Sequence, residues 1–145
     1  MVNNAILEKT MSFSIRIVKM YSYLKDEKKE FVLSKQVLRS GTSIGANAHE
    51  AHNGESDKDF LHKMYIALKE ATETEYWLLL LLKTEFLPEN HGYSVLKDCV
   101  ELKRILTAII KTTKTKIKAK ETKAETRKQG TENKKEKSNE NTDDK

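Results

Sequence analysis

The chain has 145 residues, of which 37% are hydrophobic and 34% are charged, with one proline and one cysteine. This length allows one domain with a tail, and the scarcity of proline and glycine excludes most all-β folds. A single cysteine excludes an internal disulfide and a four-thiolate zinc site. The longest apolar run, Tyr76 to Leu82, is far shorter than the roughly 20 residues that cross a bilayer. The N-terminus lacks the basic-then-apolar pattern of a secretion signal, so we expect a soluble cytoplasmic protein.

Two N-terminal segments carry apolar or small residues at spacings of three and four, which is typical of amphipathic helices that pack at a shallow angle. The first stripe consists of Ile6, Phe13, Ile17, Met20 and Leu24. The second stripe consists of Leu33, Val37, Ser40, Ile44, Asn47 and Ala51. The polar run KDEKKE, residues 25–30, separates these two predicted helices.

Two further segments continue the same period. The third stripe consists of Phe60, Met64, Ala67, Ala71, Thr74, Leu78 and Leu81, and the fourth of Val95, Cys99, Leu102, Leu106 and Ile109. Residues 53–59 and 87–93 break the pattern, with Gly54 suited to a helix C-cap and Ser56 to an N-cap. Short connections between long helices favour antiparallel neighbours. The sequence therefore predicts an all-α, antiparallel up-down four-helix bundle over residues 1–118.

Residues 119–145 form a charged, low-complexity tail. Beyond Ile117 there is no aromatic residue and almost no aliphatic one, so we expect this tail to be disordered or a fraying helical extension. Residues 112–145 contain 11 basic and 7 acidic side chains, a net charge of +4, whereas residues 1–111 contain 16 and 15, a net charge of +1. The basic excess suggests a polyanionic partner, and a merely solvated tail explains it equally well.

The stretch from Arg39 to Ser56, RSGTSIGANAHEAHNGES, admits three interpretations. A phosphate-binding loop is excluded because Gly45 is followed by Ala46 and not by the lysine of a Walker motif. A metal site would rest on His49 and His52, but HEAH is not the HExxH pattern of zinc proteases. We therefore expect no metal and no cofactor.

The third interpretation is close helix packing. Small side chains recur beside the second stripe, and the predicted packing set is Gly41, Ile44, Gly45, Asn47, Ala48 and Ala51. Two glycines inside a helix cost about 2 kcal/mol in helix propensity, which a close approach of another helix would offset. Asn47, if buried on this stripe, needs an amide partner and is a candidate register-setting group.

VLRSGTSIGANAHEA, followed by DFLHKMYIALKEATETEYWLLLL, resembles the 23S rRNA intervening-sequence protein family from about Phe13 to Leu87. The matching positions are Arg39, Ser43, Ile44, Ala46, Asn47, Glu50, Ala51 and residues 67–78. Ala48 stands where that family often has isoleucine. The resemblance implies a four-helix bundle, commonly a ring-like homopentamer without established catalytic activity. Some members are encoded inside an insertion in the large ribosomal RNA gene.

That family shares its fold with the accessory variability determinant of diversity-generating retroelements. By analogy, this relationship implies nucleic acid and a protein such as a reverse transcriptase as partners, bound through basic surface. The tail lies outside the resemblance.

The third predicted helix is apolar around almost its whole circumference near its C-terminal end. A helix in a lone bundle needs only one buried stripe, so a second apolar face indicates contact with another subunit. The predicted oligomer interface consists of Tyr76, Trp77, Leu79, Leu82 and Phe86. A wide bundle core is the alternative.

A basic stripe runs along the fourth helix, opposite its apolar stripe. Lys97, Arg104, Lys111 and Lys118 recur every seven residues, and Lys114 lies beside them. Such a stripe can follow a phosphate backbone, although charged helix faces are usually just solvated. Further candidates on the first two helices are Arg16, Lys19, Lys35 and Arg39. Because Tyr65, Tyr76 and Trp77 are expected inside the bundle or its interfaces, binding should be led by the backbone and weakly sequence-selective.

Catalysis is not expected. No histidine follows an arginine at the spacing of helical ribonucleases, and the carboxylates mostly alternate with lysines as on a solvated helix surface. The sequence thus predicts a non-catalytic, oligomeric helical adaptor that binds RNA or DNA backbone. The alternative is a protein–protein adaptor or structural oligomer that binds no nucleic acid.

Overall fold

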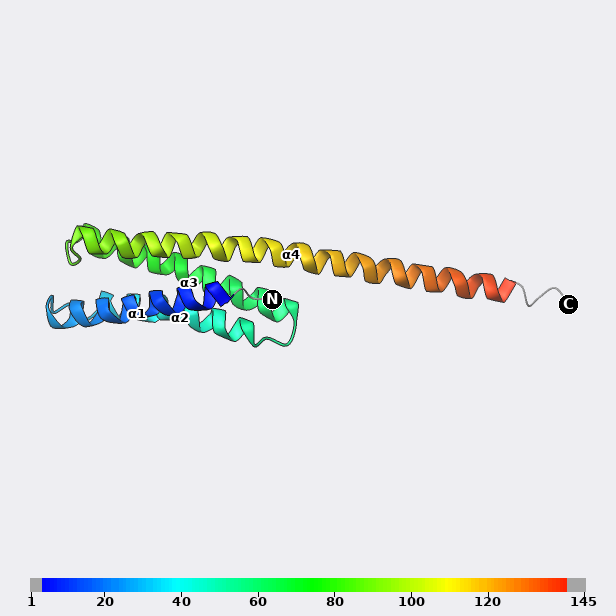
Figure 1. Cartoon of the computed structure of the whole chain (residues 1–145), viewed down its shortest axis with the longest axis horizontal. Coiled ribbons are helices and arrows are strands. Elements are labelled where there is room, and N and C mark those ends of the chain that lie inside the picture. The colour runs from blue at the N-terminus through cyan, green and yellow to red at the C-terminus, as the bar shows by residue number, and fades with distance from the viewer. Residues whose placement is uncertain (1–3, 141–145) are drawn as a thin grey trace.

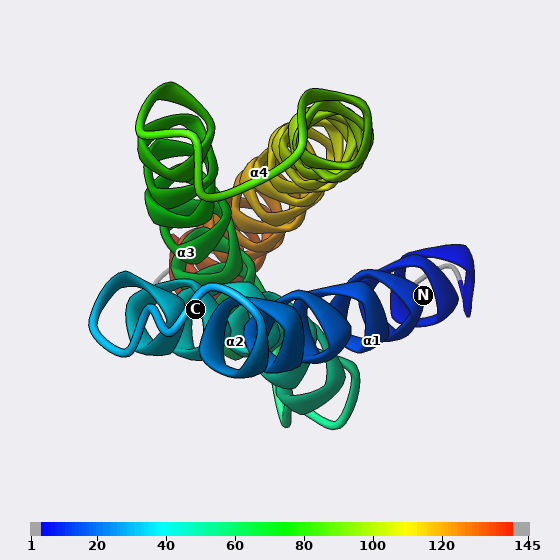
Figure 2. The same cartoon turned by 90° about the vertical axis from the view of Figure 1, so that its left-hand side faces the viewer.

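The computed structural model describes residues 4–140, which form four helices and no strand (Figure 1). The helices are α1 (Asn4–Asp26), α2 (Leu33–His52), α3 (Asp57–Lys83) and α4 (Glu89–Glu140). Consecutive helices run in opposite directions, with α1 and α2 in one layer and α3 and α4 in the other (Figures 1 and 2). Each helix contacts its neighbours in sequence, and α1 also contacts α4. The prediction of an all-α four-helix bundle is confirmed.

The predicted stripes form the core. Every residue of the first stripe is buried, and so is the third stripe from Met64 to Leu81. On α4 the prediction fails at one position, because Ile110 is buried and Ile109 only half-buried. A straight helix has 3.6 residues per turn, so a stripe whose spacings alternate strictly between three and four residues gradually turns away from the core. On α4 two successive spacings of four, from Leu102 to Leu106 and from Leu106 to Ile110, keep the stripe facing the core.

A buried polar contact joins α2 to α3. Ser40 and Thr74 are both fully buried, and the Thr74 hydroxyl donates to Oγ of Ser40 at 2.9 Å. Asn47 was the residue expected to set the register, but it is only half-buried and its amide donates to the Ser43 carbonyl of its own helix at 2.8 Å. The polar link between these helices is therefore a pair of hydroxyls.

The backbone of α2 lies close to α1 at two glycines. A Cβ atom on Gly41 would lie 2.8 Å from Cγ1 of Ile17, and one on Gly45 would lie 3.3 Å from both Oγ of Ser14 and Cβ of Thr10. The remaining small residues of the stripe, Ala48 and Ala51, are buried. Close approach of the two helices thus depends on the missing side chains.

Glu30 organises the turn between α1 and α2. Its Oε1 accepts the backbone N–H groups of Val32 and Leu33 at 2.9 Å each, and its Oε2 accepts that of Ser34 at 2.6 Å. Burial raises the pKa of Glu30, but these hydrogen bonds together outweigh burial and leave the pKa below its ordinary value of 4.5. The carboxylate therefore satisfies the first free donors of α2.

The connection between α2 and α3 follows the predicted capping. Ser56 precedes the first residue of α3, and its hydroxyl accepts the backbone N–H of Asp59 at 3.1 Å. Gly54 lies one residue beyond the cap residue Asn53 and donates its N–H to the Ala51 carbonyl without a positive φ.

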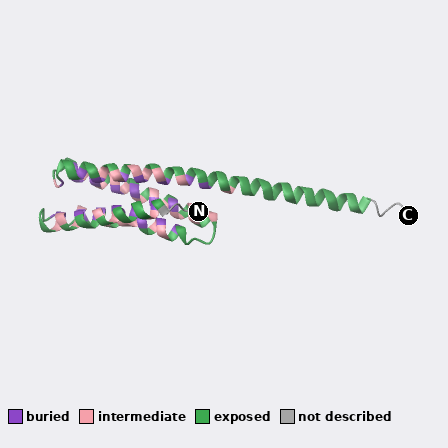
Figure 3. Cartoon of the chain, viewed as in Figure 1, coloured by how far each residue is buried: buried purple, intermediate pink, exposed green. Residues whose placement is uncertain are grey.

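α4 is much longer than α1 and α3, the helices that it packs against. Thr113 is its last buried residue, Ile117 is half-buried, and every residue from 118 to 140 is exposed (Figure 3). We call residues 118–140 the extension. The tail from residue 119 was expected to be disordered or a fraying helical extension; the chain stays helical to Glu140, and residues 141–145 lie outside the described part. Lengthening a packed helix needs no new nucleation, and lysine, glutamate and alanine are good helix formers.

Gly41→Ala should lower the free energy of unfolding, because the new methyl group would overlap Ile17. Overpacking costs about 1–3 kcal/mol and outweighs the roughly 1 kcal/mol that alanine gains in helix propensity. Gly130→Ala is the matched control, since its Cβ would meet nothing within 4 Å. Urea denaturation should show a loss only for Gly41→Ala, and equal behaviour of the two variants would contradict the close contact.

Glu30→Gln should lower the free energy of unfolding by about 1 kcal/mol at neutral pH, because it weakens a charge-assisted cap. A carboxyl group with a lowered pKa stabilises the fold above its unfolded pKa, and this contribution is lost as pH falls through the folded value. The difference between the two proteins should therefore shrink below pH 4.5. A difference that persists unchanged in acid would refute the role of the charge.

Candidate nucleic-acid interface

The outer face of α4 presents the predicted basic stripe to solvent. Lys97, Arg104, Lys111 and Lys118 are all exposed, on the side of α4 away from its buried residues. Within residues 4–140, the side chains of Lys97, Lys111 and Lys118 make no ion pair or hydrogen bond. Only Glu101, 4.0 Å from Arg104, brings a carboxylate to this stripe. The ammonium groups are therefore available to an anion.

Lys114 is exposed but engaged with an aromatic ring. Its Nζ lies 5.0 Å from the ring centroid of Tyr65 on α3, within the range of a cation–π contact. Such a contact is weak at an exposed site and leaves the positive charge accessible. Lys114 thus stays beside the stripe, held toward α3.

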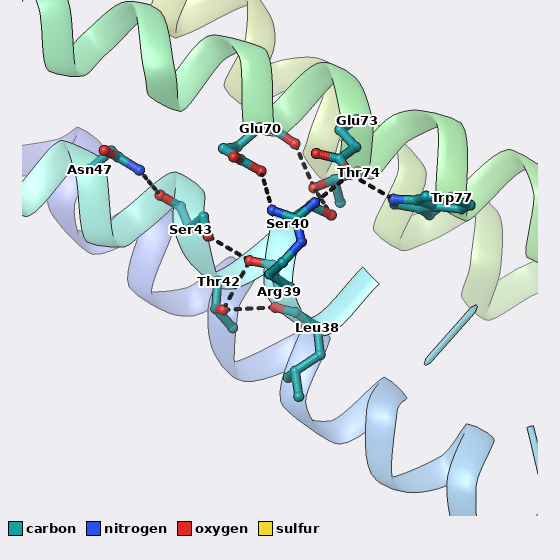
Figure 4. A network of polar contacts seen from close by, with 10 residues as sticks. All are labelled: Leu38, Arg39, Ser40, Thr42, Ser43, Asn47, Glu70, Glu73, Thr74 and Trp77. Carbon is teal, nitrogen blue, oxygen red and sulfur yellow. Dashed lines mark hydrogen bonds and ion pairs between the residues drawn. The ribbon is translucent and has the colours of Figure 1, made fainter. Parts of the chain in front are cut away.

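Two of the predicted cations on α1 and α2 are committed to ion pairs within the bundle. Arg16 donates to Asp98 of α4 at 2.5 Å and to the Ser94 hydroxyl at 3.1 Å. Arg39 bridges two carboxylates of α3 (Figure 4), donating to Glu70 at 3.2 Å and to Glu73. Both arginines therefore have carboxylate partners within the bundle, unlike Lys97, Lys111 and Lys118.

The Arg39 network is an electrostatic clamp between α2 and α3. The hydrogen bond to Glu73 is the main cause of the raised pKa of Arg39, and it lowers the pKa of Glu73. Glu73 also accepts Nε1–H of Trp77 at 3.3 Å. Both shifts favour the charged forms, so Arg39 and Glu73 are an oppositely charged pair at neutral pH.

Lys19 and Lys35 are exposed, and neither side chain makes an ion pair with any described residue. They lie on α1 and α2, away from the continuous line of charge on α4. They add isolated positive charge to the bundle surface.

Two exposed apolar side chains that were not predicted lie beside the stripe on α4. Tyr93 is 57% exposed and Val100 is 49% exposed. Tyr93 precedes Lys97 by one helical turn, so an aromatic ring and an ammonium group stand side by side. The stripe was defined by its basic residues alone, so the apolar residues on the same face were not included.

The predicted oligomer residues divide into three groups. Tyr76 is 60% exposed, whereas Trp77, Leu79 and Phe86 are half-buried. Leu82 is buried within the chain, because Gly92 of α4 allows it a contact that no larger residue would permit. Leu82 therefore cannot belong to an exposed face.

A second exposed apolar stripe lies on α1 and was not predicted. Met11, Ile15 and Val18 are spaced by four and three residues, and each is about half exposed. They lie on the side of α1 away from its buried residues. Scattered exposed apolar residues are common, but a row on one helix face is typical of a contact surface.

The side chains that could support catalysis or metal binding, such as Cys99 and His49, have ordinary packing and hydrogen bonds. Cys99 is buried, which is the main reason its pKa rises to about 12, and its thiol donates to the Ala71 carbonyl. Nδ1 of His49 lies 2.7 Å from the Gly45 carbonyl oxygen. Among residues 4–140 no three His, Cys, Asp or Glu side chains gather as a metal site would require.

No helix in that range is long and apolar enough to cross a membrane.

The fold and the exposed basic stripe define a small helical-bundle protein with a long cationic C-terminal helix. Residues 2–108 match the family described as 23S rRNA-intervening sequence protein, and the chain belongs to this family. A crystal structure of a protein with unknown function from the S23 ribosomal protein family of Bacteroides thetaiotaomicron VPI-5482 is 50% identical, with a TM-score of 0.74. That similarity covers 77% of this chain and 99% of the other. No curated protein matches the chain.

Proposed function

We propose that this protein is a non-catalytic, oligomeric helical-bundle protein of the cytoplasm that binds RNA or DNA through the exposed cations of α4. The observation that carries the proposal is the exposed row of Lys97, Arg104, Lys111 and Lys118. From Lys97 to Lys118 the helix rises by 21 steps of 1.5 Å, or about 32 Å. A row of this length matches several successive phosphates of a nucleic-acid backbone.

The chemistry of the row supports contact with phosphate more than with bases. Lysine and arginine neutralise phosphates and release counterions, which gives affinity without reading sequence. Tyr93 is the only exposed aromatic side chain on this face of the described α4. One ring cannot form the series of stacking sites that single-strand readers use. Binding should therefore show little sequence selectivity.

A protein–protein adaptor is the second candidate function. The exposed stripe of Met11, Ile15 and Val18 favours it, because apolar rows on a helix are suited to another protein surface. The two functions differ in one measurable property, since only phosphate binding should weaken steeply with salt.

Assembly of several copies would strengthen either function. The family resemblance implies a homopentamer, and each added copy would repeat the basic row. Weak contacts of each row to one nucleic acid would then add through avidity. The exposed apolar residues on α1 and α3 are the candidate contacts between copies.

Binding of a labelled RNA duplex and of the matching DNA duplex should weaken as salt rises. Each phosphate contact contributes about −0.9 to the slope of log affinity against log salt. Replacing Lys97, Arg104 and Lys111 with glutamine should make the slope less negative by about 3. The matched control replaces Lys28, Lys69 and Lys83, which are exposed elsewhere. Salt-independent binding, or an equal effect of the control, would exclude the proposed row.

Light scattering should show a mass above that of one chain, and a charge placed in the contact between copies should reduce it. Ile15→Lys tests the α1 stripe and Tyr76→Lys tests α3, since both residues are exposed and tolerate lysine in the isolated chain. Val32→Lys in the first interhelical turn, which is 70% exposed, is the control. A single-chain mass for the unmodified protein would disprove oligomerisation.

A further inference from the structure

The charges of the extension are segregated around the helix. Each residue of an α-helix advances by about 100°, so positions in one row can be found from the sequence. A basic face, which begins just before the extension, consists of Lys116, Lys120, Lys123, Arg127 and Lys134. An acidic face, about 180° away around the helix, consists of Glu121, Glu125, Glu132, Glu136 and Glu140.

The basic face is not the row on the bundle. Seven residues beyond Lys118, that row meets Glu125 and then Glu132, so it cannot continue along the extension. The basic face is instead in line with Asp98, which precedes Lys116 by about five full turns and contacts Arg16 of α1. It therefore continues the α1-facing side of α4 beyond the first residue of α1.

The cations of the basic face lack intrahelical partners. Side chains three and four residues apart are neighbours on a helix surface. At these distances from Lys123, Arg127 and Lys134 there are only neutral or basic residues. By contrast, Lys128 has Glu125 and Glu132 at these distances, and Lys135 has Glu132. The basic face thus keeps its full charge, and its neighbouring cations repel one another.

The first two cations of this face are held by Asp57, the first residue of α3. Its carboxylate accepts Nζ of Lys120 at 2.7 Å and lies 3.5 Å from Nζ of Lys116. Lys58 and Glu121 add an ion pair at 3.6 Å in the same place. Asp57, Lys116 and Lys120 also line an open cavity of about 690 Å³ between α4 and the α2–α3 connection.

We propose that the phosphate backbone of a nucleic acid lies along the basic face of the extension, and that Asp57 competes with phosphate for Lys116 and Lys120. This inference rests on the proposed function and adds a second contact, on one side of the extension, to the row on the bundle. A polyanion would relieve the repulsion between neighbouring cations, which no residue of the helix does. Asp57 would then restrain binding at the point where α4 leaves the bundle.

The composition of the extension favours nucleic acid over a membrane surface. From residue 118 to residue 140 the only apolar side chains are Ala119 and Ala124. Helices that lie in a membrane interface need a face of large apolar residues, which is missing here. From Lys116 to Lys134 the basic face extends about 27 Å, which spans several phosphates.

The first test compares two full-length variants that remove equal charge from neighbouring positions. Arg127→Gln with Lys134→Gln acts on the basic face, and Lys128→Gln with Lys135→Gln acts beside the glutamates. All four residues are exposed, and glutamine preserves helix propensity. For a labelled RNA duplex, the basic-face pair should lose affinity and make the salt slope less negative by about 2, and the control pair should change neither.

Three results would overturn this inference. Equal losses for the two pairs would show that only total charge matters, and the proposed function would survive. If the basic-face pair had no effect and only the Lys97, Arg104 and Lys111 variant lost affinity, the contact with nucleic acid would be confined to the bundle. If the unmodified protein bound no nucleic acid, both proposals would be excluded. Binding to anionic vesicles in place of nucleic acid would lead to the same conclusion.

The second test concerns Asp57. Asp57→Asn should raise affinity for the duplex and make the salt slope more negative, because two ammonium groups become free for phosphate. Glu55→Gln removes the same charge two residues away, where the side chain makes no ion pair with the described residues, and should have a smaller effect. Thermal melting checks that both variants fold. Equal gains from the two substitutions would overturn the competition.

Discussion

The structure depends on a mismatch of length between α4 and its partners. α4 has 52 residues, whereas α1, α2 and α3 have 23, 20 and 27. The shorter helices bury α4 only as far as Ile117, so nearly half of it has no buried contact and is stabilised mainly by propagation from the packed part. A helix in this situation must be polar on every side, and its charges then meet solvent or a partner. The arrangement of those charges is what gives the extension two chemically different faces.

The bundle serves to fix the direction in which α4 leaves it. Close packing at Gly41 and the Glu30 cap hold α1 against α2, and the Ser40–Thr74 contact joins α2 to α3. Asp57, at the start of α3, then contacts Lys116 just before the extension and Lys120 within its first turn. The contacts at Gly41, Ser40–Thr74 and Glu30 lie outside the proposed interface, whereas Lys116 and Lys120, which Asp57 contacts, belong to it. Charge variants at Arg127 and Lys134 can therefore be tested without disturbing the packing of the bundle.

The fold could be read from the sequence because four stripes at spacings of three and four dominate it. The ion-pair partners of individual cations could not be read from it. Arg16 and Arg39 are paired with carboxylates 82 and 31 residues away, and such partners become visible only when the helices are placed side by side. Leu82 is buried because Gly92 of another helix makes room for it. The second basic face was missed because a seven-residue repeat counted along the bundle ends at Lys118.

The central claim is that α4 is one continuous helix that projects from the bundle. Spin labels at Thr107→Cys and Thr131→Cys, both at exposed positions, would report it directly, and buried Cys99 would be replaced by serine. A continuous helix places the two backbone positions about 36 Å apart, from 24 residues at 1.5 Å each. The account predicts a narrow distribution of distances near that value. A broad distribution centred at shorter distances, as a flexible chain of this length would give, would contradict it.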